Sequence, residues 1–254
     1  MTECFKYLND HYDKVYVLTV EAASGRRKLF AERFYGLEYS FFYGADKNKF
    51  KIDDLVTQNI FNEELARKHH RYDKPLRPGE IACSWSHKMI YEDMIKHNYE
   101  SVLIFEDDAV PDSPAVNQIP TILGEIPADC ELLMWGWAKN GESNITTSLK
   151  QFWYHIQYSF GFLKWNHTII KNLYARAFSA HLKKAGFHDH TYAYAITKTA
   201  AEKLIALQTP IQYVADNLVA YAATKEIIRG YIAWPQVFLH DNLPDGTARD
   251  SYIR

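Results

Sequence analysis

The chain has 254 residues, of which 47% are hydrophobic and 24% charged, and its formal net charge is −2. This is the composition of an ordinary globular protein that is long enough to bury a substantial core. The charge balance argues against a general nucleic-acid binder, and three widely separated cysteines argue against a disulfide framework. No secretory signal and no apolar run of about eighteen residues is visible, so we expect a cytoplasmic protein.

The first half of the chain alternates between strand-like and helix-like segments. Short runs of β-branched and aromatic residues predict strands, and apolar residues spaced by about 3.6 positions predict helices. The predicted strands are 15–20, 39–43, 101–105 and 131–135, and the predicted helices are 26–35, 53–68, 79–98 and 115–124. Strands that alternate with helices indicate a single-domain α/β fold with a mostly parallel central sheet.

The second half contains a segment without acids. No Asp or Glu occurs between Glu142 and Asp189, an interval with six Lys or Arg residues, four histidines and many aromatic residues. Basic residues interleaved with Trp and Tyr suit anionic lipid headgroups, so we expect peripheral binding to the cytoplasmic face of an inner membrane. The alternative is a helical insert whose aromatic residues form a small core. Further predicted strands are 191–197, 227–233 and 236–239, and further predicted helices are 199–207 and 214–224.

Three adjacent carboxylates, Glu106, Asp107 and Asp108, follow the predicted strand 101–105. Adjacent acids repel one another, and a hard divalent cation such as Mg²⁺ or Mn²⁺ relieves that repulsion. Because side chains alternate along a strand, Glu106 and Asp108 can face together toward a metal-bound diphosphate. The alternative is a solvated acidic loop.

Ligands of open α/β sheets bind beyond the carboxyl ends of the strands. Two further predicted strands end at Thr19, Val20 and Asp46, which we therefore expect on the same rim. No GxxxxGK[ST] motif and no GxGxxG motif after a strand is present, so a P-loop ATPase and a dinucleotide oxidoreductase are not supported. HExxH and GxSxG are absent as well.

Four ordered blocks of this sequence resemble glycosyltransferase family 25, which includes bacterial lipooligosaccharide galactosyltransferases. Residues 41–46 are similar to the family's FFDAVDG turn, 79–87 to its GEIGCxxSH block, 103–110 to LILEDDVV, and 191–204 to AYxISxxGAxKL. The resemblance implies a nucleotide-diphospho-sugar transferase domain of the GT-A type. It implies transfer of a hexose, with galactose favoured, from a UDP-sugar to a lipooligosaccharide or lipopolysaccharide acceptor, with a divalent metal and with inversion.

The resemblance also suggests roles for parts of the chain. One domain spans 1–254, in which 1–140 mainly binds the nucleotide-sugar and 141–254 mainly the acceptor. Glu106 and Asp108 stand in place of the family's DxD-like metal motif. His240 is a candidate third ligand, because neutral imidazole also binds Mn²⁺; the alternative is an exposed loop histidine. The donor-binding candidates are Thr19, Val20, Arg26, Asp46, Ser86, His87 and Asp107.

Some of these candidates have simpler explanations. His87 could be a core histidine bonded to backbone, and Asp46 could serve only its turn. Inversion in one displacement needs a base for the acceptor hydroxyl. The resemblance favours Asp216, which could also be a helix N-cap. Asp189 is the second candidate, although partly charged imidazoles on both sides would keep its pKa low.

A second functional class stays open beside the enzyme. The same fold could serve as a non-catalytic, or differently catalytic, nucleotide-sugar-binding module. The strand-end acids and a plausible base favour the transferase.

Overall fold

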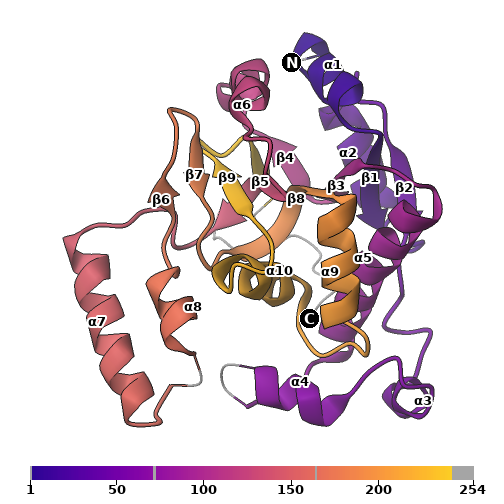
Figure 1. Ribbon diagram of the computed structural model, residues 1–254. Coiled ribbons are helices and arrows are strands. Elements are labelled where there is room, and N and C mark those ends of the chain that lie inside the picture. The colour runs from indigo at the N-terminus through magenta and orange to yellow at the C-terminus, as the bar shows by residue number, and fades with distance from the viewer. Residues whose placement is uncertain (1, 71–72, 164, 242–254) are drawn as a thin grey trace.

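The computed structural model describes residues 2–70, 73–163 and 165–241, which form a mixed sheet covered by helices (Figure 1). The eight strands of this sheet are ordered β2-β1-β3-β8-β5-β9-β7-β6. Their bounds are β1 Lys14–Thr19, β2 Ser40–Tyr43, β3 Ser101–Glu106, β5 Leu132–Ala138, β6 Arg176–Ala177, β7 Leu182–Lys184, β8 Asp189–Thr197 and β9 Gly230–Ala233. A separate antiparallel pair joins β4 (Ala109–Pro111) to β10 (Phe238–His240).

Helices cover both faces of the main sheet. On one face Phe5 and Phe30 share a buried cluster with Phe105 of β3; on the other, Tyr91 and Leu204 share one with β8. The result is a three-layer arrangement of the kind that α/β proteins adopt. The helices are α1 Thr2–His11, α2 Ser24–Arg33, α3 Ile52–Thr57, α4 Glu63–His69, α5 Pro78–Lys96, η1 Ala115–Gln118, α6 Ile119–Glu125, α7 Ile145–Ser159, α8 His167–Lys171, α9 Lys198–Leu207 and α10 Ala215–Thr224.

The direction of the strands decides which residues can meet. β1 pairs in parallel with both β2 and β3, so the carboxyl ends of these three strands share one edge of the sheet. β8 runs antiparallel to both of its neighbours, β3 and β5. The prediction of a mostly parallel sheet is therefore confirmed for β1, β2 and β3 and is wrong for β8. As a consequence, the amino end of β8 lies at the same edge as the carboxyl end of β3.

The α/β order predicted from the first half of the chain is confirmed, although some elements differ from the prediction. The predicted helix 53–68 is two helices, because Asn59 takes a left-handed conformation (φ 55°) and Asn62 caps α4 by accepting the N–H of Leu65 at 2.9 Å. Helix α1 was not predicted. It packs through Phe5 and Leu8, and these few apolar residues do not show a clear spacing of 3.6 positions in the sequence.

The later strands also differ from their predicted bounds. β9 begins at Gly230 instead of 227, after a turn with Glu226 at φ 59°. The predicted strand 236–239 is β10, which pairs with β4 outside the main sheet. Among the residues that the structure describes, no helix combines the length and apolarity needed to cross a bilayer.

Candidate active site

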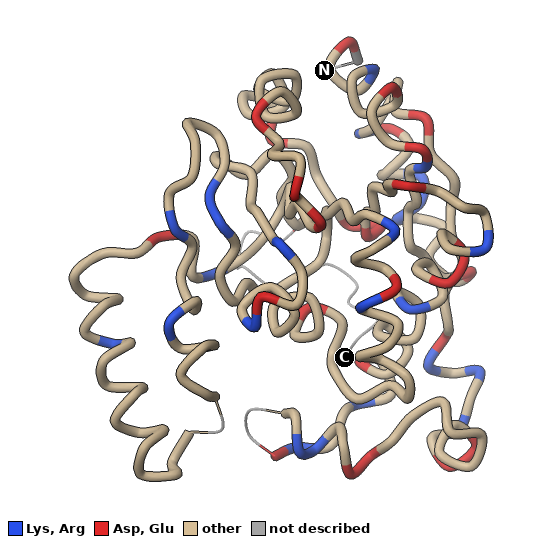
Figure 2. The backbone as a smooth tube through the Cα atoms, viewed as in Figure 1, with Lys and Arg blue, Asp and Glu red and all other residues tan. Residues whose placement is uncertain are grey.

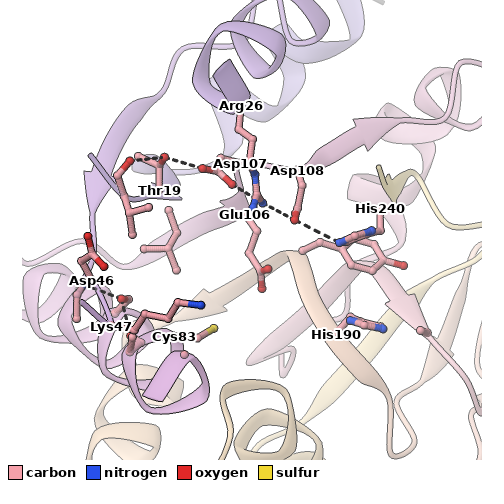
Figure 3. A pocket seen from close by; sticks show the side chains of 18 of the residues that line it. Thr19, Arg26, Asp46, Lys47, Cys83, Glu106, Asp107, Asp108, His190 and His240 are labelled. Atoms are coloured by element: carbon pink, nitrogen blue, oxygen red, sulfur yellow. Dashed lines mark hydrogen bonds and ion pairs between the residues drawn. The ribbon is translucent and has the colours of Figure 1, made fainter. Parts of the chain in front are cut away.

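A cavity of ≈ 870 Å³ opens at the edge where β1, β2 and β3 end (Figure 3). Its volume lies in the range of small-molecule sites, roughly 300–1,000 Å³. Nine of the twelve predicted site residues line it: Thr19, Val20, Arg26, Asp46, Ser86, Glu106, Asp107, Asp108 and His240. His87, Asp189 and Asp216 are not among the lining residues.

Arg26 of α2 provides the positive charge that the strand-end acids meet. Its Nη2 lies 2.5 Å from Oδ1 of Asp107 and also pairs with Oδ2 of Asp108. In Figure 3 the guanidinium lies between the two carboxylates. Both acids are buried, with exposed fractions of 5% and 8%, so the alternative of a solvated acidic loop is wrong.

Both carboxylate oxygens of Asp107 have partners within the protein. Its Oδ1 pairs with Arg26, and its Oδ2 accepts a 2.6 Å hydrogen bond from the Thr19 hydroxyl at the end of β1. Burial raises the pKa of Asp107 to about 6, against the lowering effect of Arg26 and Thr19. Asp107 therefore fixes Arg26 and ties β1 to β3.

Asp108 faces a different set of groups. Its Oδ2 lies 3.2 Å from Nε2 of His240, and its Oδ1 is buried without a hydrogen-bond partner. His240 is on β10 with a side chain only 16% exposed, so it is not an exposed loop histidine. The pair places a carboxylate and an imidazole together with one oxygen left to bind something else.

Glu106 contacts residues of β8 and α5, on a different side from Arg26. Its Oε1 accepts a 2.7 Å hydrogen bond from the Thr191 hydroxyl of β8 and lies 3.6 Å from Nε2 of His87. Burial acts to raise the pKa of Glu106, but His87 and Thr191 outweigh it and lower the pKa. Glu106 is thus an anion held between α5 and β8.

His87 belongs to a buried chain of polar side chains behind the cavity. Its Nδ1 lies 2.7 Å from the Tyr194 hydroxyl, which lies 2.8 Å from the Tyr91 hydroxyl. The core alternative is right about its burial, although its partner is a tyrosine side chain instead of backbone. His87 therefore lies beside Glu106 and does not face the cavity.

Among the described residues, one group of three potential metal ligands has all its ligand atoms within 4.8 Å of one another: Cys83, His87 and Glu106. Glu106 is thus grouped with α5 and not with Asp108 and His240. Burial raises the pKa of the Cys83 thiol well above its usual value, so the neutral thiol is favoured. Hard divalent cations prefer oxygen ligands to sulfur, so the Asp108 side is the better place for Mg²⁺ or Mn²⁺.

β2 reaches the cavity because Gly44 lets it approach α5 closely. A Cβ at Gly44 would lie 2.2 Å from Oγ of Ser86, and this Oγ accepts a 2.9 Å hydrogen bond from the Ala45 N–H. The approach places Asp46 on the rim. Asp46 accepts the N–H of Asn48 at 2.9 Å, so the turn role is observed, and it also lines the cavity.

The two predicted bases serve neighbouring groups. Asp216 accepts the N–H of His190 at 3.1 Å and that of Asn217 at 2.7 Å, and burial raises its pKa. It is not an N-cap, because α10 begins at Ala215 and Val214 occupies the cap position. Asp189 is paired with Lys139.

Charged imidazoles do not flank Asp189 on both sides, contrary to the expectation. The His188 ring is fully buried, and burial lowers its pKa to about 4, so it is neutral at pH 7. The positive partner of Asp189 is Lys139, at the end of β5.

Sequence reasoning did not assign His190 a role, yet its side chain lines the cavity beside His240 (Figure 3). The centroids of the two rings are 5.9 Å apart. His190 has φ 69°, a conformation that non-glycine residues rarely adopt and that is often found at functional sites. The only sequence signal for His190 is its position at the start of a strand. Because β8 is antiparallel to β3, the start of β8 lies at the edge of the sheet where the cavity opens.

The mixed sheet and its acidic strand-end cavity are consistent with a Rossmann-like glycosyltransferase fold. The family model described as "Glycosyltransferase family 25 (LPS biosynthesis protein)" matches residues 12–219. The chain therefore belongs to glycosyltransferase family 25.

Similar proteins carry related names. A "Glycosyltransferase 25 family member" of Aedes aegypti is 33% identical over 97 residues, which is 37% of this chain and 16% of that protein. A "Probable inactive glycosyltransferase 25 family member 3" of Bos taurus is 22% identical over 207 residues, covering 78% of this chain and 29% of its own length. A "Putative glycosyltransferase" of Haemophilus influenzae is 28% identical over 97 residues, which is 37% of this chain and 31% of that protein. The matches thus span less than a third of each of these relatives.

We predict that Arg26→Met destabilises the protein. It leaves Asp107 and Asp108 buried side by side without their cation, and removing one partner of a buried pair costs about 3–5 kcal/mol. In a chain of this size the loss corresponds to roughly 6–20 °C in Tm. Thermal unfolding measures it, with Lys28→Met on the exposed side of α2 as the matched control.

Mn²⁺ should raise the Tm of the Arg26 variant more than that of the wild type, because the ion supplies the missing positive charge. An unchanged Tm in the variant would contradict the assigned role of Arg26.

Proposed function

We propose that this chain transfers a hexose from a UDP-sugar to a saccharide acceptor of a lipooligosaccharide or lipopolysaccharide, with inversion and with Mn²⁺ or Mg²⁺. Galactose is the proposed sugar, and the cytoplasm is the proposed location. Membership of a family described by lipopolysaccharide biosynthesis supports the reaction class. The observation that carries the proposal is a cavity of suitable size with buried acids at the carboxyl ends of parallel strands.

In this proposal the domain is of the GT-A type and its two halves divide the substrates. Residues 1–140 provide the strand-end wall that binds the nucleotide-sugar, with Thr19, Val20, Asp46 and Ser86 on the rim. Residues 141–254 bind the acceptor. The cavity supports this division, because its other wall includes His190, Tyr192, Gln236, Leu239 and His240.

The proposed metal ligands are Asp108 and His240, whereas Glu106, the third candidate from the sequence, is held by Thr191 and His87 on the other side. The residues fit a hard divalent cation, because Asp108 keeps one buried oxygen without a hydrogen bond beside the imidazole of His240. When bound, such an ion neutralises charge that develops on a diphosphate leaving group. Arg26 holds Asp107 and Asp108 in place and adds positive charge next to the same position.

The proposed base is His190, positioned by Asp216. A base must be able to reach the acceptor hydroxyl, and His190 lines the cavity whereas Asp216 and Asp189 do not. The hydrogen bond from the His190 N–H to Asp216 supports its left-handed backbone. Asp216 therefore acts through His190 in this scheme.

The second candidate, a nucleotide-sugar-binding module without transfer, is favoured by one observation. Arg26 already neutralises Asp107 and Asp108, so the acids have a partner without a metal. Two mammalian relatives of 22% identity are also named inactive or probably inactive.

Asp108→Asn should abolish metal-dependent transfer. The substitution keeps the side-chain shape and removes a charged ligand, and a loss of several kcal/mol in transition-state stabilisation corresponds to about 10²-fold or more in rate. Release of UDP from UDP-galactose, with a saccharide acceptor and Mn²⁺, measures it. Asp54→Asn on the exposed face of α3 is the control and should keep full activity.

Chelation of the metal should reduce wild-type UDP release to the level of the variant. Full activity of Asp108→Asn in the presence of EDTA would overturn the metal assignment. Tight UDP binding without any UDP release, across a screen of donors and acceptors, would favour the binding module.

His190→Asn should lower kcat by roughly 10²–10⁴-fold, the usual effect of removing a general base, with donor binding unchanged. Asparagine tolerates the left-handed conformation, so the backbone should keep its shape. Asp216→Asn should have a smaller effect, because in our proposal it acts through the backbone of His190. The opposite order in single-turnover rates would return the role of base to Asp216.

A further inference from the structure

The outward face of α7 and the residues just after its end carry apolar side chains that no other described part of the chain covers. Six large hydrophobic side chains, four on α7 and two directly after it, are between 56% and 84% exposed. Spacings of four, three and one along the helix place the first four on one side. These side chains, called here the α7 stripe, are Ile145, Leu149, Phe152, Trp153, Phe160 and Phe162.

The opposite face of α7 packs against the rest of the protein. Tyr154 packs against Trp165 with ring centroids 6.0 Å apart, and Gln151 donates a 2.7 Å hydrogen bond to the carbonyl of Ile170. The small aromatic core, which was the alternative prediction for this segment, is therefore present on the inner face. Among the described residues, the α7 stripe stays exposed while this inner face packs against the rest of the protein.

Within residues 143–188 every Asp, Glu, Lys or Arg position is basic. No Asp or Glu occurs between Glu142 and Asp189, and Figure 2 shows α7 and α8 with blue but no red segments. Lys150 on α7 and Lys171 at the end of α8 are exposed. A helix with Trp, Phe and Leu on one side and Lys beside them suits the interface of an anionic bilayer.

Not every basic residue of the segment belongs to this surface. Nζ of Lys183 lies 3.1 Å from the centre of the Trp234 ring and donates a hydrogen bond to the carbonyl of Gly141 at 3.2 Å. Lys183 thus serves the fold, contrary to the expectation that the whole segment faces lipid. Lys164 lies outside the described residues.

We propose that α7 is a docking helix for a membrane that contains anionic phospholipid. The α7 stripe enters the apolar boundary of the headgroup region, and Lys150 and Lys171 contact the phosphates. The absence of Asp and Glu from residues 143–188 favours this occupant over a basic or neutral protein partner. Docking would keep the cavity close to saccharides that are anchored in the same membrane.

Co-sedimentation of the full chain with vesicles tests the proposal. Binding should be stronger to vesicles of phosphatidylglycerol and phosphatidylcholine than to phosphatidylcholine alone, and it should fall with salt as the Debye length shrinks to about 3 Å at 1 M. Phe152→Ser with Phe160→Ser should weaken binding at least about tenfold. Lys150→Glu should weaken it roughly fivefold or more.

Matched controls keep the same chemistry elsewhere on the surface. Tyr35→Ser removes another exposed aromatic residue, and Lys6→Glu reverses another exposed charge on α1; both should leave vesicle binding unchanged. Because every substituted residue is exposed, circular dichroism should show the wild-type fold in each variant.

Equal binding to both kinds of vesicle, or undiminished binding by the Phe152 and Phe160 double variant, would overturn the proposal. So would a dimer in sedimentation velocity that the double variant converts to a monomer while neither protein binds vesicles. The assay uses no sugar donor, so it succeeds or fails independently of the proposed transfer reaction.

Discussion

The ion pairs of Arg26 with Asp107 and Asp108 are the constraint on which the site depends. A chain that ends a buried strand with three adjacent acids would otherwise place strong repulsion at the edge of its sheet. Arg26 comes from α2, directly after β1, and Thr19 at the end of β1 donates to the same carboxylate. One guanidinium and one hydroxyl thus fix the ends of β1 and β3 relative to each other.

The antiparallel strand β8 joins the two halves of the chain at this edge. Since it pairs with β3 in the reverse direction, its first residues lie beside the last residues of β3. The hydrogen bond from Thr191 to Glu106 is the direct result, and His190 reaches the cavity from the same place. A parallel β8 would have placed these groups at the opposite edge, and the acids would have faced only the first half of the chain.

Much of this arrangement could be predicted from local patterns. The strand before Glu106 and the rim formed by Thr19 and Asp46 follow from short apolar runs with polar ends, because parallel strands bring their carboxyl ends together. The direction of β8 could not be predicted, since an apolar run has the same pattern in either direction. The contacts of Glu106 and the cavity position of His190 depend on that direction.

Other features depended on contacts that no spacing reveals. Burial of His188, which removes its charge at pH 7, comes from packing against Trp137, with ring centroids 5.3 Å apart. The acid-free segment predicted an interacting surface, but only the structure separates the inner face of α7 from the exposed stripe. From charge composition alone, Lys183 was predicted to belong to that surface. In the structure its ammonium group instead packs on the Trp234 ring.

In our proposal, Asp108 and His240 form a metal-assisted site for a nucleotide diphosphate. A crystal structure with UDP and Mn²⁺, with anomalous scattering used to locate the manganese, tests it most directly. The account predicts a manganese peak in contact with Asp108 and His240, with the diphosphate bound to the same ion. A diphosphate bound elsewhere, or a manganese held by Cys83 and His87 instead, would contradict it.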